Sequence, residues 1–131
     1  MTTELFVLAL GGVLLIVHIV LAVHFKTKQY GAKWNMGARD EDKPPLDDIP
    51  ARLERASANF QETFPLAFVA LGGLAIAGKG TEIRAIAAWV WLIARVAYLP
   101  IYWAGIPKIR TLVFAISLLA LLTALGVLLI G

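Results

Sequence analysis

The segment Arg52-Leu-Glu-Arg-Ala-Ser-Ala-Asn-Phe-Gln-Glu-Thr-Phe-Pro65 leads directly into an apolar run that extends to Ala77. Within this stretch, Arg55, Asn59 and Glu62 are spaced so that they share one face of a helix. The apolar run indicates that the helix continues into a membrane. An ionised carboxylate is costly at that depth unless it has a partner, which makes Glu62 a candidate functional residue.

The composition of the whole chain also indicates a membrane protein. Of its 131 residues, 60% are hydrophobic, and the mean hydropathy is +0.78. These values are far above those of soluble domains, and the length predicts one compact domain over residues 1–131. The chain has no cysteine, so any thiol chemistry needs a thiol that a ligand brings. No metal site is expected, because His18 and His24 lack a helical ligand spacing, and no nucleic-acid motif occurs.

Four apolar segments are long enough to cross about 30 Å of hydrocarbon as helices. We expect spans at about residues 5–25, 51–77, 82–103 and 110–130. Pro50 favours the start of the second helix, and Gly105 with Pro107 favours the end of the third. No basic segment precedes the first span, so we expect a retained helix rather than a signal peptide. The predicted fold class is therefore an all-α, integral membrane four-helix bundle.

Lysine and arginine residues predict the orientation of the bundle, because cytoplasmic loops are enriched in them. The first loop and the third connection carry Lys26, Lys28, Lys33, Arg39, Lys43, Lys108 and Arg110. The second loop has only Lys79 and Arg84, and neither terminal segment has a basic residue. We therefore expect both termini to lie off the cytoplasmic side, with the first and third connections in the cytoplasm.

Depth along the antiparallel second and third helices predicts an ion pair. Arg95, Tyr98 and Tyr102 share one face of the third helix, with Tyr102 near its cytoplasmic end. At 1.5 Å per residue, Glu62 lies about 10 Å deeper in the membrane than Arg55 on the second helix. Arg95 lies about 10 Å deeper than Tyr102 on the third helix. We therefore predict that Glu62 and Arg95 form a buried pair, which is the least costly way to keep both charged in a membrane. A single pair of this kind could also serve only to hold the helices together.

Further cationic and amide groups at the same end predict a pocket. Arg55 and Asn59 lie in the first turns of the second helix, and Arg110 and Thr111 open the fourth. The unpaired N–H groups at the start of a helix also favour an anion. We expect a site for a small, partly anionic molecule that opens to the cytoplasm.

His18 and Trp91 lie inside the predicted spans, and we expect neither to bind a ligand. We expect His18, in the middle of the first span, to be a hydrogen-bonded packing residue rather than a ligand. We expect Trp91, like the other tryptophans, to be an interface anchor or lipid-facing bulk.

These motifs resemble those of the MAPEG family, the membrane-associated proteins in eicosanoid and glutathione metabolism. The family's second-helix pattern stands here as Arg55, Asn59, Glu62 and Pro65. The third-helix pattern stands as Arg95-Val-Ala-Tyr98-Leu-Pro-Ile-Tyr102, and the arginine that opens the fourth helix stands in Ile109-Arg110-Thr111. The resemblance covers nearly the whole chain and is to bacterial-type members similar to microsomal glutathione transferase.

The resemblance implies a homotrimer of four-helix protomers in a bacterial inner membrane, in contact with lipids. It implies that glutathione is a cosubstrate bound between neighbouring subunits at the cytoplasmic side. The residues that would contact or orient glutathione are Arg55, Asn59, Glu62, Arg95, Tyr98 and Tyr102. Arg110 would stabilise the thiolate, and Thr111 could donate a hydrogen bond to the sulfur. The thiolate would attack a lipophilic electrophile from the bilayer or reduce a lipid hydroperoxide.

Three positions depart from the pattern of some family members. Ala58 stands where some members have a basic residue, and Ser57 and Tyr98 stand where some have histidine. These changes remove possible carboxylate contacts, so another thiol remains an alternative. The alternative function is a non-catalytic trimeric protein that binds a lipid headgroup or other anion in the same pocket. A small channel or transporter is disfavoured, because the outer halves of the four helices are wholly apolar.

Overall fold

The structure, a computed structural model, describes residues 1–79 and 81–131, and within these ranges it contains helices and no strand. The elements are α1 (Thr3–Tyr30), α2 (Ala32–Met36), α3 (Asp48–Ala67), the π-helical turn η1 (Phe68–Gly72), α4 (Gly73–Ala77), α5 (Glu82–Ala104) and α6 (Pro107–Ile130). Four stretches, Thr3–Tyr30, Asp48–Ala77, Glu82–Ala104 and Pro107–Ile130, are long and apolar enough to cross a membrane. The predicted all-α architecture with four membrane-spanning helices is confirmed.

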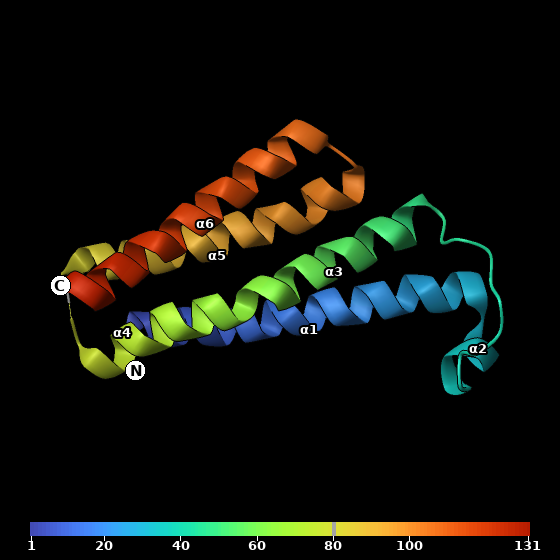
Figure 1. Ribbon diagram of the computed structural model, residues 1–131, viewed down its shortest axis with the longest axis horizontal. Coiled ribbons are helices and arrows are strands. Elements are labelled where there is room, and N and C mark those ends of the chain that lie inside the picture. The colour runs from blue at the N-terminus through green and yellow to red at the C-terminus, as the bar shows by residue number, and fades with distance from the viewer. Residues whose placement is uncertain (80) are drawn as a thin grey trace.

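The helices form two antiparallel hairpins (Figure 1). α1 packs against α3, and α5 packs against α6. Both termini lie at one end of the molecule, here called the terminal end, whereas α2 and the α5–α6 turn lie at the opposite end, here called the α2 end. α6 reaches the second span mainly through η1 and α4, so this contact is concentrated away from the α2 end.

The first helix is longer than its apolar segment. α1 ends at Tyr30 rather than near residue 25, because Lys26, Lys28 and Gln29 are good helix formers. Gly31 then stops the helix with a φ of 99°, a conformation that glycine adopts readily. The short α2 follows in a segment that was expected to be a loop.

The second span changes its helical pitch on the way through the bundle. Asp47 is the N-cap of α3, and Pro50 is tolerated because it lies in the first turn. Pro65 lies inside α3, and the backbone widens into η1 before α4 ends at Ala77. The span is thus a continuous helical stretch that carries the polar residues of α3 at the α2 end.

Aromatic side chains form the centre of the bundle around Phe60 of α3. The Phe60 ring lies 6.1 Å from the Trp91 ring and 5.5 Å from the Phe64 ring, and the His18 ring stacks on it at 4.9 Å. The expectation that Trp91 faces lipid is wrong, because its side chain is only 1% exposed. Gly11 of α1 makes room for it, since a Cβ there would lie 2.7 Å from Trp91 Cη2. His18 is buried and packs on Phe60, as expected, but the expected hydrogen bond is missing, because neither ring nitrogen has a partner among the described residues.

Candidate functional site

A polar pocket lies at the α2 end, between α3 and the α5–α6 turn. Its volume is about 240 Å³, and it is lined by Arg52, Arg55, Tyr102, Gly105, Pro107 and Arg110; we call it the arginine pocket. No group of three side chains that could hold a metal ion occurs in residues 1–79 and 81–131. Because three cationic side chains converge on it, the arginine pocket is the candidate functional site.

Tyr102 of α5 joins two of these arginines. Nε of Arg55 donates a hydrogen bond to Tyr102 Oη at 3.1 Å. Cζ of Arg110 lies 4.7 Å from the centroid of the same ring, which is a cation–π contact. Arg55 and Arg110 come from α3 and α6, so two distant parts of the chain meet at one side chain. Of the predicted site residues, the structure thus brings Arg55, Tyr102 and Arg110 together.

The arginine pocket carries three positive charges and no acidic partner among the residues that the structure describes. The ion pairs in that part of the chain are Lys26–Glu54 and Arg84–Glu4, and neither involves a pocket arginine. Pro107 begins α6, and the N-cap residue Ile106 provides no side-chain acceptor. The free N–H groups of this helix start add to the positive potential. Such a site favours a ligand with several anionic groups.

The predicted ion pair between Glu62 and Arg95 is wrong within the protomer. Arg95 is 1% exposed, and its Cζ lies 4.2 Å from the Tyr98 ring, 5.1 Å from Phe60 and 5.6 Å from Phe114. None of its three side-chain nitrogens has a hydrogen-bond partner in the described chain. Glu62 is exposed and lies roughly 200° around α3 from the core residue Phe60. Equal depth does not bring two side chains together when they leave their helices in different directions.

The other predicted site residues do not line the arginine pocket. Tyr98 is buried and packs edge to face against Tyr102, with the ring centroids 5.6 Å apart. This contact helps to hold the Tyr102 ring in place. Asn59 is half-buried, and its Oδ1 is enclosed without a hydrogen-bond partner among the described residues. Thr111 is exposed, and its Oγ1 donates a hydrogen bond to the Pro107 carbonyl at 3.2 Å.

Three lining residues, Arg52, Gly105 and Pro107, were not predicted as site residues from the sequence. Nη1 of Arg52 donates a hydrogen bond to the Trp103 carbonyl at 3.4 Å. Gly105 lies directly beneath this guanidinium, because a Cβ on Gly105 would be 2.7 Å from Arg52 Cζ. The spacing of Arg52 and Arg55, three residues apart on one helix, was a signal that could have identified Arg52. The contact between Gly105 and Arg52 could be identified only from the packed structure, because the two residues lie far apart in the sequence.

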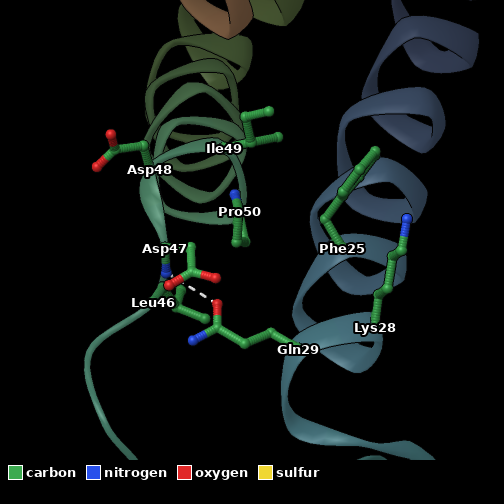
Figure 2. A pocket seen from close by; sticks show the side chains of 8 residues that line it. All are labelled: Phe25, Lys28, Gln29, Leu46, Asp47, Asp48, Ile49 and Pro50. Atoms are coloured by element: carbon green, nitrogen blue, oxygen red, sulfur yellow. Dashed lines mark hydrogen bonds between the residues drawn. The ribbon is translucent and has the colours of Figure 1, made fainter.

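A larger pocket, about 820 Å³, lies at the same end between the close of α1 and the start of α3 (Figure 2). Gln29 Oε1 accepts a hydrogen bond from the Asp47 N–H at 2.8 Å, and Gln29 Nε2 donates one to the Pro45 carbonyl at 3.2 Å. The Asp48 carboxylate points away from α1 (Figure 2). The polar groups here anchor the first loop on α1, and Lys28 with Asp47 gives the lining both signs of charge. This pocket therefore lacks the excess of one charge that distinguishes the arginine pocket.

Comparison with known proteins assigns the chain to a family. The family model described as the MAPEG family matches residues 5–130, nearly the whole chain. No curated protein and no solved structure gave a match. The matched range includes every residue of the arginine pocket. The chain therefore belongs to the MAPEG family, the membrane-associated proteins in eicosanoid and glutathione metabolism, and is an integral membrane protein with four helices able to span the bilayer.

Proposed function

We propose that the protein is a glutathione-dependent transferase or peroxidase that acts on lipophilic molecules from the bilayer. The observation that carries this proposal is the convergence of Arg55 and Arg110 on Tyr102, in a pocket without an acidic partner among the described residues. Glutathione in its thiolate form carries two carboxylates and a sulfur anion, which suit this excess of positive charge. Membership of the MAPEG family supports glutathione as the thiol.

In this proposal Arg110 activates the thiol. A free thiol has a pKa of about 8.5, and a neighbouring cation or a helix N-terminus lowers it. Arg110 lies in the first turn of α6, so both influences act from the same place. The thiol proton passes to water, and the guanidinium holds the sulfur anion. Thr111 can assist only if its hydroxyl leaves the Pro107 carbonyl and donates to the sulfur instead.

The thiolate can then follow one of two routes. With an electrophile it forms a carbon–sulfur bond, and the displaced electron pair leaves with the departing group or moves onto an acceptor atom. With a hydroperoxide it attacks one peroxide oxygen, the O–O bond breaks, and the lipid alcohol leaves after protonation. A second glutathione thiol then reduces the sulfenic acid to a disulfide and releases water.

Glu62 and Asn59 support a homotrimer in which glutathione binds between neighbouring chains. Both lie on the face of α3 that carries Arg55, and Glu62 is exposed. On the surface of a protomer, Glu62 could accept the glutathione ammonium, and the unpartnered Oδ1 of Asn59 could accept an amide N–H. Arg95 and Tyr98 are buried, so in this proposal they orient the ligand through Tyr102 rather than by contact.

The excess of lysine and arginine at the α2 end supports an orientation in which this end faces the cytoplasm of a bacterial inner membrane. Glutathione would then enter from the aqueous side. The lipophilic substrate would arrive laterally from the bilayer.

A non-catalytic trimeric protein that binds a lipid headgroup or another anion in the arginine pocket is the second candidate. Two observations favour it. The Thr111 hydroxyl is already bonded to the Pro107 carbonyl, and Ala58 supplies no charge beside Asn59. A phosphate group would satisfy the same arginines.

Titration of the detergent-solubilised protein with glutathione separates these two functions. The ultraviolet absorbance of a thiolate should appear at neutral pH, and Arg110→Ala should abolish it. Lys108→Gln removes an exposed charge from the same turn and should leave the signal unchanged. Failure to bind millimolar glutathione, together with co-purified lipid and no turnover of model electrophiles, would support the second candidate.

A further inference from the structure

Arg52 is held in the arginine pocket by a hydrogen bond to the end of α5 and by close packing on Gly105. Its Nη1 donates to the Trp103 carbonyl at 3.4 Å, which fixes the guanidinium against the end of α5. Gly105 has a φ of 75°, and a Cβ at this position would lie 2.7, 2.9 and 3.0 Å from three guanidinium atoms of Arg52. The α5–α6 turn is thus shaped to accept this side chain.

Most of the hydrogen-bonding capacity of Arg52 is unused within the described chain. A guanidinium has five N–H donors, and one of them meets the Trp103 carbonyl. The nearest acidic residue in sequence on the same helix, Glu54, forms its ion pair with Lys26 at 3.6 Å instead. Arg52 therefore presents a planar fork of donors to the pocket.

The neighbourhood of Arg52 is electrostatically unfavourable without an anion. Arg52 and Arg55 lie three residues apart on α3, and like charges at that spacing destabilise a helix. Arg110 adds a third charge from α6. Two of the three arginines contact the Tyr102 ring, whereas Arg52 packs on Gly105.

We propose that Arg52 binds a carboxylate of the thiol ligand and makes the pocket selective for thiols that carry carboxylates. This inference rests on the proposed function and adds the residue that selects among thiols. Arg110 would take the sulfur anion, and the fork of Arg52 would take a carboxylate oxygen pair in the bidentate geometry that guanidinium groups favour. Ala58 of α3 is uncharged, so Arg52 and Arg55 are the cationic residues that α3 contributes to the pocket lining.

The test compares two thiols on the full-length protein in detergent. The first is glutathione, and the second is its diethyl ester, which keeps the thiol and loses both carboxylate charges. The wild-type protein should bind the diester more weakly than glutathione. In Arg52→Gln the ratio of the two dissociation constants should fall about tenfold, the size expected for one charge-assisted hydrogen bond.

Control variants keep the result interpretable. Lys108→Gln should retain the wild-type ratio, because Lys108 is exposed in the same turn. Arg52→Lys keeps the charge without the fork and should give an intermediate ratio, and it serves as the test if Arg52→Gln does not fold. A wild-type ratio in both Arg52 variants overturns the assignment of Arg52 alone. A wild-type protein that binds neither thiol overturns the proposed function and the assignment with it.

Discussion

The guanidinium of Arg110 in α6 lies over the ring of Tyr102 in α5, across the turn that joins their helices, with Arg110 Cζ 4.7 Å from the ring centroid. The hydroxyl of the same ring accepts a hydrogen bond from Arg55 of α3. One aromatic ring therefore fixes the separation of two guanidinium groups from different helices. The charge in the arginine pocket depends on the α5–α6 turn as much as on α3.

Tyr102→Phe should weaken glutathione binding without unfolding the protein. The substitution removes the acceptor of the Arg55 hydrogen bond and keeps the ring beneath Arg110. The expected loss is about 1 kcal/mol of binding free energy, or roughly fivefold in affinity. Tyr102→Ala should lose more, because the contact with Arg110 disappears as well. Titration of the thiolate absorbance measures both, and equal affinity in wild type and Tyr102→Phe would show that the bond does not position Arg55.

Glu62 and Arg95 should behave as independent residues in unfolding experiments. Arg95 lies among three aromatic rings, and Glu62 is exposed. We expect Glu62→Gln and Arg95→Met to change the free energy of unfolding additively, within about 0.5 kcal/mol. Arg95→Met should itself be mild, because it replaces a buried charge by an apolar chain of similar length. A coupling energy of about 2 kcal/mol or more between the two substitutions would show that Glu62 and Arg95 form an ion pair after all.

The Arg84–Glu4 ion pair at the terminal end should contribute to the free energy of unfolding, whereas the Lys26–Glu54 pair at the α2 end should not. Arg84 Nε lies 2.7 Å from Glu4 Oε1, and the Glu4 side chain is 2% exposed. Glu4→Gln should lower the free energy of unfolding by about 2–3 kcal/mol, because it leaves Arg84 without its counter-charge. Glu54→Gln is the matched control. Its pair with Lys26 spans 3.6 Å with the Glu54 side chain 49% exposed, so thermal unfolding should barely change.

Two adjacent glycines of α1 should respond oppositely to alanine. A Cβ on Gly11 would lie 2.7 Å from Trp91 Cη2, whereas a Cβ on Gly12 would meet nothing within 4 Å. Gly11→Ala should destabilise the protein by about 1–3 kcal/mol, because the buried indole cannot easily move. Gly12→Ala should stabilise it by up to about 1 kcal/mol, through the better helix propensity of alanine. Thermal unfolding of both variants in one detergent checks the pair, and a stable Gly11→Ala would mean that Trp91 can repack.

Hydropathy and motif spacing predicted the features that depend on one helix at a time. The four spans follow from apolar length, and Arg55 lies in the pocket because residues at helical spacing share a face. α1 ran past its apolar segment, because membrane thickness limits the apolar stretch and not the helix. Gly105 ended α5 and Pro107 began α6, since both residues act through local backbone geometry.

Hydropathy and charge along the chain were enough to predict an integral membrane protein, its four helices able to span a membrane and the end of the bundle where most cationic groups lie. Which of these groups contact one another depends on how the helices pack. Depth follows directly from the rise per residue, but the direction of a side chain depends on which face of its helix the core takes. Phe60 turns its face of α3 into the core, and this leaves Glu62 exposed while Arg95 is enclosed by aromatic rings. The same packing brings Arg52 against Gly105, a contact that no spacing along the chain could predict.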